Sequence, residues 1–448
     1  MFPLCSYNEV PMLNFLRNLL PNQHPLRLLY HKLMAMAAAF RYRFPAEKMT
    51  IIAVTGTNGK TTTGNIIHRI FMEAGKKTGL LTTVNFKIGD REEANLNKQT
   101  TVSPFLLQKK LSQMLNAGCE VVIVEATSIA MVQSRLWGVT VDTAVFTNFT
   151  QDHLSYHGSM ESYREAKGRL FARLNTSKRK PGVQKISVIN ADDPEHEYFE
   201  QFPVDQMFQY GIQRGAYAAR NIVGQPNGTN FLIRIPNGEQ QVRFKIPGQF
   251  NVYNALAAAT VGVAHHINLT TIGAALEKMQ PVPGRVESID EGQPYNVIVD
   301  YAHSEDSLQQ LLAMLKELTV GRLITVFGAT GGGRDQAKRP KMGAIAHQYS
   351  DYIVLTDDDP YEEDSNEIAR MVREGIPREE GDGFWQVIDR KEAIRLAFSQ
   401  AREGDTVVIC GKGAEEFQVV GRERIPHDDR QVAREMLART IDIEVPLA

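Results

Sequence analysis

Short apolar runs alternate with helix-spaced apolar residues along most of this chain. From residue 49 onward, the runs 51–54, 121–124 and 143–146 are rich in Ile, Val and Ala, and segments with helical spacing separate them. Continuous apolar runs are typical of strands buried on both faces, and intervening helices connect such strands in parallel. The pattern therefore predicts an α/β fold with a mostly parallel, doubly wound sheet.

The pattern changes after residue 176. Short runs at 186–189, 231–235 and 242–246 are separated by turn residues and predict a small β appendage. A helical stretch then reaches a Pro-Val-Pro-Gly turn at 281–284, where a second α/β series begins. The expected strands of that series are residues 297–299, 323–327, 353–355 and 407–409. The expected domains are residues 1–48, 49–282 and 283–448.

A basic helix is expected before the first strand. Pro25 suits the first position of a helix, and apolar residues then recur at helical spacing. The apolar residues are Leu26, Leu29, Leu33, Met36, Ala37 and Phe40. The basic residues are Arg27, His31, Lys32, Arg41 and Arg43. Such a helix commonly packs on the following domain and exposes a charged face, and the alternative is a weak contact with a membrane surface or a partner helix.

The composition narrows the range of partners. Of 448 residues, 43% are hydrophobic and 23% are charged, and a net charge of -2 predicts no general affinity for nucleic acid. Cys5, Cys119 and Cys410 are far apart, so neither a disulfide framework nor a cysteine zinc site is expected. No apolar run is long enough to cross a bilayer and no signal peptide is recognised, so the expected location is cytoplasmic and the expected partners are small-molecule substrates.

The sequence TGTNGKT at 55–61 follows the first apolar run and precedes a helical pattern. Glycines allow backbone N–H groups to approach phosphate oxygens, Lys60 would neutralise phosphate charge, and the Thr61 hydroxyl could bind Mg²⁺. Val54 stands where the strict Walker motif has its first glycine. A simple glycine turn is the alternative, but Gly-Lys-Thr-Thr directly after a strand favours nucleotide binding.

Other polar residues also follow predicted strands. Glu125 ends one strand, and His153 comes shortly after another, so with Thr61 they could hold Mg²⁺ over phosphates. A histidine such as His153 is as often a structural hydrogen-bonding residue. In the second series, Asp300 and His303 end a strand, where they could contact ribose, phosphate or base. Two such domains facing one cleft indicate an enzyme that closes on ATP and a second substrate.

Several motifs occur in one order along the chain. Residues 55–62 read TGTNGKTT, 148–158 NFTQDHLSYHG, 251–258 NVYNALAA, 282–285 VPGR, 300–303 DYAH, 334–340 RDQAKRP, 411–413 GKG and 428–430 DDR. With these motifs the chain resembles the ATP-dependent Mur ligases from residue 55 almost to its carboxyl end. The resemblance implies a central ATPase domain, a carboxyl-terminal Rossmann-like domain, and peptidoglycan synthesis through addition of an amino acid to a muramoyl-dipeptide carboxylate by way of an acyl phosphate.

The resemblance also implies roles for individual residues. The catalytic set would be Lys60, Glu125, His153, Lys167 and Arg285. ATP would be bound by Gly56, Thr57, Asn58, Gly59, Lys60, Thr61, Thr62, Asn254, Arg285, Asp300 and His303. The muramoyl acceptor and the amino acid would be bound by Thr100, Thr101, Thr127, Gln133, Arg135, Arg334, Asp359, Tyr361, Gly411 and Glu415. Mg²⁺ would be held by Thr61, Glu125, His153 and a carbamylated Lys167, since a carbamate turns this cation into an anion.

The chain departs from the family pattern in three places. Only residues 1–48 precede the central domain, so the usual uridine-binding domain is not expected. The motif Asp-Asn-Pro-Arg of diaminopimelate-adding members is Asp-Asp-Pro-Tyr at 358–361, which removes an arginine that would pair with a distal carboxylate. Two family histidines are Ile129 and Ala414 here. We therefore expect lysine or another diamine to be preferred over meso-diaminopimelate.

Three alternatives remain at this stage. A folylpolyglutamate synthase relative would also begin close to the phosphate loop, although the paired Thr100 and Thr101 disfavour it. A lipid-linked muramoyl acceptor would suit a membrane-bound helix, but members that act there carry a cysteine zinc insert that is not recognised here. A non-catalytic nucleotide-binding subunit would be expected to lack Lys60, Glu125, His153 or Lys167, and all four are present.

Overall fold

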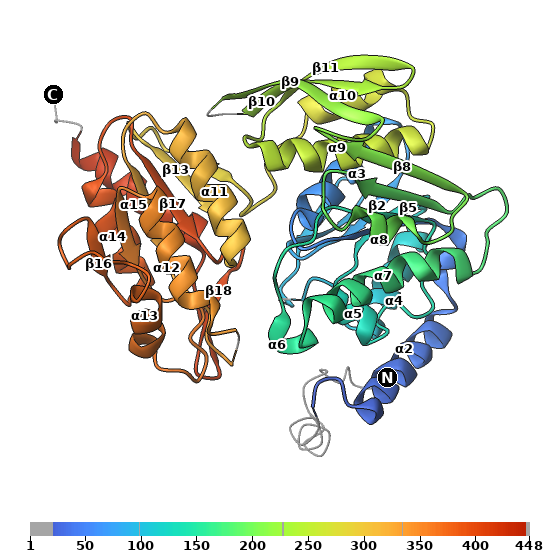
Figure 1. Cartoon of the computed structure of the whole chain (residues 1–448), viewed down its shortest axis with the longest axis horizontal. Coiled ribbons are helices and arrows are strands. Elements are labelled where there is room, and N and C mark those ends of the chain that lie inside the picture. Colours follow the sequence, from blue (N-terminus) through green and yellow to red (C-terminus); the bar gives the residue numbers. More distant parts are fainter. Residues whose placement is uncertain (1–20, 98, 226–227, 334, 445–448) are drawn as a thin grey trace.

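The computed structural model describes residues 21–97, 99–225, 228–333 and 335–444. It contains a central α/β unit, a carboxyl-terminal α/β unit and an amino-terminal helix, α2 (Pro25–Tyr42) (Figure 1). A short 3-10 helix, η1 (Pro45–Lys48), connects α2 to the first strand. The two α/β units expected from the sequence are both present.

An 11-stranded sheet organises the central unit, in the order β11-β10-β9-β8-β7-β6-β1-β5-β2-β3-β4. The middle of this sheet, from β2 to β8, is parallel, as the apolar runs predicted. The parallel strands are β1 (Thr50–Thr55), β2 (Thr78–Leu81), β5 (Val121–Glu125), β6 (Thr143–Phe146), β7 (Ile186–Asn190) and β8 (Gln206–Gly211). The outer strands are β3 (Asn85–Ile88), β4 (Arg91–Ala94), β9 (Tyr217–Gln225), β10 (Gly228–Ile235) and β11 (Gly238–Phe244).

The predicted β appendage is part of this sheet. Strand β7, which covers the run 186–189, pairs in parallel with β6 and so belongs to the parallel core. Strands β9, β10 and β11 are antiparallel to one another, but β9 pairs with β8 and extends the same sheet. The turn residues predicted short β-strands here, whereas local sequence carries no signal for the sheet edge that they join.

Helices cover both faces of the central sheet (Figure 1). One face packs against α3 (Lys60–Glu73), α9 (Gln249–Ala264) and α10 (Leu269–Glu277), around a core of Ile, Val and Ala side chains. The other packs against α4 (Pro104–Asn116), α7 (Met160–Thr176) and α8 (His196–Glu200). Two short helices, α5 (Ser128–Val132) and α6 (Leu154–His157), follow strands β5 and β6. Ligand-binding loops therefore emerge at the carboxyl ends of the parallel strands.

A six-stranded sheet in the order β12-β13-β17-β14-β15-β16 organises the carboxyl-terminal unit. All its neighbouring pairs are parallel except β12 with β13. The strands are β12 (Glu287–Ile289), β13 (Asn296–Asp300), β14 (Leu323–Phe327), β15 (Tyr352–Leu355), β16 (Phe384–Gln386) and β17 (Thr406–Cys410). Helices α11 (Glu305–Leu318), α12 (Lys338–Tyr349) and α13 (Ser365–Arg373) cover one face, and α14 (Arg390–Gln400) and α15 (Asp429–Glu444) the other. A hairpin of β18 (Phe417–Val420) and β19 (Glu423–Pro426) precedes α15.

Helix α2 packs against α4 through small residues. Ala35, Ala38 and Ala39 are fully buried, and the absence of a side chain at Gly138 allows Ala39 to approach closely. Gly138 has φ of 78°, so a side chain there would also be strained. The predicted basic helix is present from Pro25, and no helix among the described residues is long and apolar enough to cross a membrane.

Candidate active site

The loop between β1 and α3 is built for close approach to phosphate. Gly59 has φ of 82° and directly precedes α3, whose first residue is Lys60. A Cβ on Gly56 would lie 1.8 Å from the Thr147 hydroxyl oxygen, so only glycine fits. The loop is held from the end of β6, because Thr57 N donates to the Asn148 backbone oxygen at 2.8 Å and Asn58 N donates to Asn148 Oδ1 at 2.8 Å. This strand-loop-helix arrangement orients backbone N–H groups for an anion.

Two lysines converge on one carbonyl oxygen of this loop. Lys60 Nζ donates to Gly56 O at 3.1 Å, and Lys167 Nζ, from α7, donates to the same oxygen at 2.6 Å. Burial lowers the pKa of Lys60. The pKa of Lys167 is lowered well below its usual value, first by burial and then by the charge of Lys60. Lys167 is therefore a buried amine for which the neutral form is unusually favourable.

Glu125 lies against the first turn of α3. Its Oε1 accepts from the Thr61 hydroxyl at 2.7 Å and from Thr83 N at 3.0 Å, while Oε2 accepts from the Thr83 hydroxyl at 3.0 Å. Glu125 is 1% exposed, so these donors replace water around a buried carboxylate. One carboxylate and one hydroxyl fit Mg²⁺, which keeps several waters and takes its other ligands from substrate phosphates.

The remaining predicted metal ligands are placed elsewhere. His153 has φ of 55°, and its Nε2 lies 3.5 Å from an oxygen of Asp152. Lys167 meets Gly56, as described above, and its ammonium nitrogen lies 4.4 Å from the centroid of the Tyr163 ring. The described residues contain no group of three His, Cys, Asp or Glu side chains that could hold a metal ion. Thr61 and Glu125 are thus the predicted metal ligands that the structure joins directly.

Two further residues predicted to bind ATP lie beside the loop. Thr62 is in the first turn of α3 and is 6% exposed. Asn254 of α9 faces Gly59, and its Oδ1 accepts from the Thr63 hydroxyl at 3.2 Å. Its Nδ2 donates to Asn251 Oδ1 at 3.0 Å, so both ends of this amide are already bonded to protein. Asn254 thereby supports the loop in this structure.

The predicted acceptor-binding residues form one connected group at the ends of β2 and β5. The Thr101 hydroxyl donates to the Glu125 backbone oxygen at 2.8 Å and lies 3.2 Å from the Thr127 hydroxyl. Arg135 donates to Thr101 O at 2.6 Å and to Gln133 Oε1 at 2.9 Å. Thr100 accepts from the Thr83 hydroxyl at 3.0 Å, which places this group next to Glu125.

The carboxyl-terminal unit contributes Arg285. Its guanidinium lies 4.4 Å from the centroid of the Tyr301 ring, and its Nε is buried without a hydrogen-bond partner among the described residues. A buried donor of this kind fits an anionic ligand. Asp300 instead accepts from Val286 N and Ala302 N, both at 2.7 Å, and burial raises its pKa. His303 lies close by, with Nδ1 2.8 Å from the Tyr301 oxygen.

A cluster of carboxylates surrounds one lysine near the expected amino-acid site. Lys412, which is fully buried, lies 2.9 Å from Asp359 Oδ1, 3.0 Å from Glu415 Oε2 and 3.9 Å from Asp358 Oδ1. Burial alone would lower the pKa of Lys412, but these carboxylates raise it. Asp359 is therefore paired with Lys412, and the local excess of negative charge comes from three carboxylates around one ammonium.

Two other residues predicted to bind the acceptor or the amino acid lie near this carboxylate cluster. Gly411 has φ of 114° and lies beside Asp358. Tyr361 has φ of 54° and packs against Gly332. Arg334 lies outside the described residues.

A cavity of about 40 Å³ joins the two units. Thr83 and residues 94–96 line it from the central unit, and Arg285, Tyr301, Lys412 and residues 414–417 line it from the carboxyl-terminal unit. Across the same interface Asn58 donates to Asp306 at 2.6 Å. The cleft thus brings together the neighbours of the phosphate loop, the unpartnered arginine donor and the carboxylate cluster.

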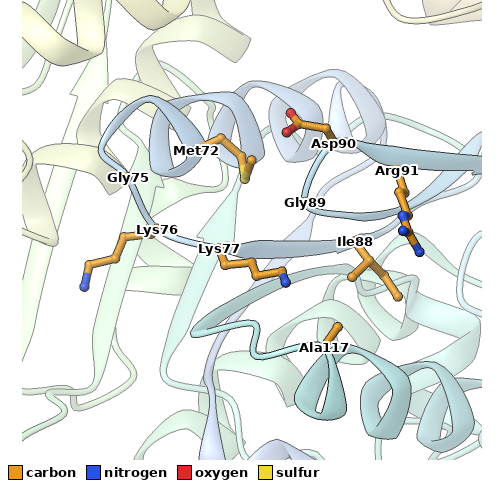
Figure 2. A pocket seen from close by; sticks show the side chains of 9 residues that line it. All are labelled: Met72, Gly75, Lys76, Lys77, Ile88, Gly89, Asp90, Arg91 and Ala117. Atoms are coloured by element: carbon orange, nitrogen blue, oxygen red, sulfur yellow. The ribbon is translucent and has the colours of Figure 1, made fainter.

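Another cavity, of about 620 Å³, lies away from this cleft (Figure 2). Lys76 and Lys77 line it just before β2, at the amino end of the parallel strands. The carboxyl ends of α3 and α4 face it, and their partial negative charge disfavours phosphate there. The interdomain cleft is therefore the candidate site.

Sequence reasoning missed three contributors. Thr83, Asp306 and Lys412 each contact a predicted site residue, namely Glu125, Asn58 and Asp359. Lys412 stands in the Gly-Lys-Gly motif after an apolar strand, so that motif could have identified it. The partners of Thr83 and Asp306 depend on chain packing, which leaves no local signal.

Comparison with known proteins shows the family. Residues 54–262 match the Mur ligase middle domain, and residues 284–413 match the Mur ligase glutamate ligase domain. The chain is 44% identical to a UDP-N-acetylmuramoyl-L-alanyl-D-glutamate–2,6-diaminopimelate ligase of Geobacillus kaustophilus, over 90% of this chain and 81% of that protein. It is 41% identical to a UDP-N-acetylmuramyl-tripeptide synthetase of Roseiflexus, over 91% and 82%.

A solved structure agrees. A UDP-N-acetylmuramoyl-L-alanyl-D-glutamate–2,6-diaminopimelate ligase matches with a TM-score of 0.61 and 32% identity, over 88% of this chain and 79% of that one. Both α/β units are thus accounted for by one family. The chain belongs to the Mur ligases, the ATP-dependent amide ligases of peptidoglycan synthesis.

Proposed function

We propose that this chain adds an amino acid to the glutamyl carboxylate of UDP-N-acetylmuramoyl-L-Ala-D-Glu. The carboxylate attacks the γ-phosphorus of ATP, giving an acyl phosphate and ADP, and the amine then displaces phosphate to form the amide. The observation that carries this proposal is the interdomain cleft, where Thr83, Arg285 and Lys412 face one cavity. The named relatives favour a muramoyl acceptor over folate. The proposed domains are residues 1–48, 49–282 and 283–448.

Cationic and anionic side chains have different proposed roles in the reaction. Lys60, with the amino end of α3, would bind the β- and γ-phosphates, and Arg285 would stabilise charge that develops on the γ-phosphoryl group. Thr61 and Glu125 would hold Mg²⁺, which neutralises phosphate charge when bound. Support comes from the Thr61–Glu125 contact of 2.7 Å and from the unpartnered Nε of Arg285. Asn254, Asp300, His303 and His153 are proposed ATP and metal contacts that would have to exchange their present partners.

We also propose that Lys167 reacts with CO₂. A neutral amine attacks carbon dioxide to give a carbamate and release one proton, and the lowered pKa of Lys167 favours that neutral amine. The resulting anion would lie beside Lys60, because both lysine nitrogens bond to Gly56 O. Removing dissolved CO₂ should lower turnover and bicarbonate should restore it, while a Lys167→Ala enzyme should be slow in both conditions. Equal turnover of the native chain in both conditions would contradict the carbamate.

The preferred amino acid is proposed to be lysine or another diamine. Three carboxylates around one lysine make this region suited to a second ammonium group and unfavourable for a second carboxylate. Tyr361 stands where diaminopimelate-adding members carry arginine, so no bidentate partner for a distal carboxylate is supplied at this position. The relatives named as diaminopimelate ligases argue for the opposite choice, which makes the substrate comparison decisive.

Phosphate release from ATP reports turnover of the proposed ligase reaction. ATP, Mg²⁺ and UDP-N-acetylmuramoyl-L-Ala-D-Glu are combined with lysine, ornithine or meso-diaminopimelate, and reactions without acceptor or without amino acid serve as controls. Turnover with lysine or ornithine that exceeds turnover with diaminopimelate supports both the reaction and the amino-acid preference. Preference for diaminopimelate would overturn the amino-acid preference alone. No turnover with any of the three would overturn the proposed acceptor.

A further inference from the structure

Helix α2 exposes an unusually large apolar face. The exposed fractions of Leu26, Leu29, Leu33 and Phe40 are 63%, 52%, 53% and 63%. Their spacing of three, four and seven residues places them on one side of the helix, opposite the buried Ala35, Ala38 and Ala39. Figure 1 shows α2 along the lower edge of the central unit, outside the helices that cover the sheet. Contiguous apolar surface of this kind marks an interaction site.

Basic residues border that face on both sides. At 100° per residue, Lys32 falls on one side of the leucine stripe and Arg41 on the other, and both are exposed. Arg43 follows directly and is also exposed. No Asp or Glu occurs from residue 25 to residue 46, so nothing acidic in this stretch offsets the positive charge.

We propose that α2 binds the surface of an anionic lipid bilayer, with Leu26, Leu29, Leu33 and Phe40 inserted among the acyl chains. An apolar stripe with Lys and Arg at its edges is the pattern of a helix that lies in the membrane interface. Anionic head groups supply the complementary charge, each Lys or Arg near the surface strengthening binding about fivefold.

The position of α2 determines which side of the central unit would face the bilayer. Gln23, just before the helix, donates from Nε2 to the backbone oxygen of Tyr156 at 2.6 Å. Tyr156 lies in α6, and its hydroxyl accepts from Gln133 at 3.3 Å, within the group proposed to bind the acceptor. Docking through α2 would therefore hold the acceptor side of the central unit near the bilayer.

Vesicle flotation of the full chain tests the proposal. We expect binding to vesicles of phosphatidylglycerol and phosphatidylcholine, little binding to phosphatidylcholine alone, and weaker binding at high salt. The double variant Leu29→Glu/Leu33→Glu should bind the anionic vesicles at least about a hundredfold more weakly, on the order expected for losing two buried leucines. Lys32→Glu/Arg41→Glu should lose the preference for anionic lipid.

Val320→Glu is the matched control, because Val320 is 94% exposed in the other unit and should bind vesicles like the native chain. Thermal unfolding of each variant checks that folding is unchanged, and phosphate release is scored separately, so failure of the ligase proposal does not affect this readout. Absence of native binding to anionic vesicles would overturn the proposal. So would unchanged binding by Leu29→Glu/Leu33→Glu, or a stable dimer that this double variant dissociates in the absence of lipid.

Discussion

The two sides of the interdomain cleft gather different charged groups. On the phosphate-loop side, Lys60 and Lys167 both donate to the oxygen of Gly56, and Arg285 approaches from the other unit. On the far side, the carboxylates of Asp358, Asp359 and Glu415 surround Lys412. The proposed function places phosphate on the first side and the amine on the second, although both are loops at the carboxyl ends of parallel strands.

The position of a loop in the fold therefore does not by itself decide which ligand that loop can bind. Loops at the same place in the two sheets present a pair of lysines in the central unit and a group of three carboxylates in the carboxyl-terminal unit. A buried contact also fixes each side: Glu125 accepts from Thr61 on the first, and Arg390 pairs with Asp429 behind the second.

Lys60→Ala should cause the largest effect. Removing the cation from the phosphate side should slow phosphate release by about 10³-fold or more, since charge stabilisation provides most of phosphoryl-transfer catalysis. Lys76→Ala is the control, because Lys76 lies just beyond the same helix and pairs with Glu120 on the surface at 2.8 Å. Near-normal phosphate release by Lys60→Ala would show that the phosphate side is not where the reaction occurs.

Arg390→Met should destabilise the anionic side. Arg390 makes a bidentate pair with Asp429, at 2.8 and 2.7 Å, and donates to the backbone oxygens of Asp357 and Cys410, which precede the carboxylate loop and Gly411. Breaking this buried pair should lower the free energy of unfolding by about 3 kcal/mol or more in chemical denaturation. The double variant Arg390→Met/Asp429→Leu should recover part of the loss. An unchanged midpoint for the single variant would contradict this role.

Mild acid should weaken the central unit before the carboxyl-terminal unit. Burial is the main cause that lowers the pKa of His68, His157 and His265 to about 4. Because an unfolded histidine titrates near 6.5, the unfolded state binds more protons between about pH 6.5 and 4, and stability falls as the pH falls. Asp193, whose pKa burial raises to about 6, opposes this change. The net loss from pH 7 to 5 should be about 2 to 4 kcal/mol.

The carboxyl-terminal unit has the opposite balance over that range. Burial raises the pKa of Asp300 and Asp357, so their protonation favours the folded state as pH falls. Arg390 lowers the pKa of Asp429, despite its burial, so the stability from that pair is lost only below about pH 4. Hydrogen exchange followed by mass spectrometry should show central-unit peptides losing protection first. Simultaneous loss in both units would contradict the assignment.

Tyr361→Arg should have the smallest effect, a change in which amino acid is preferred. A guanidinium near the carboxylate cluster would offer a bidentate partner to the distal carboxylate of diaminopimelate. The ratio of kcat/KM for diaminopimelate to that for lysine should rise about tenfold or more. Tyr361→Gln serves as a control that changes shape without adding charge. An equal rise with Gln would attribute the effect to space and not to charge.

The sequence predicted the fold well where periodicity is local. Apolar runs identified β1, β5 and β6 and, in the carboxyl-terminal unit, β13, β14, β15 and β17, and Pro25 marked the start of α2. It did not predict that β9 to β11 extend the central sheet, because edge pairing depends on which strand is left unpaired after folding. In the cleft, the phosphate-loop motif pointed to Lys60, a strand end to Glu125, and the family resemblance alone to Lys167. The Thr83–Glu125 and Lys412–Asp359 pairs join residues that are 42 and 53 positions apart, so no local pattern reports them.

The contact between α2 and Trp137 gives this chain a built-in fluorescent reporter. The Trp137 ring lies 6.2 Å from the ring of Phe40 and 6.1 Å from that of Phe44, between centroids. The sequence has two tryptophans, and the other, Trp385, lies in β16 of the distant unit beside Tyr352. A Trp385→Phe variant would leave a single tryptophan, at the base of α2. Its emission wavelength and quenching would then follow the environment of this helix in real time, without any attached dye.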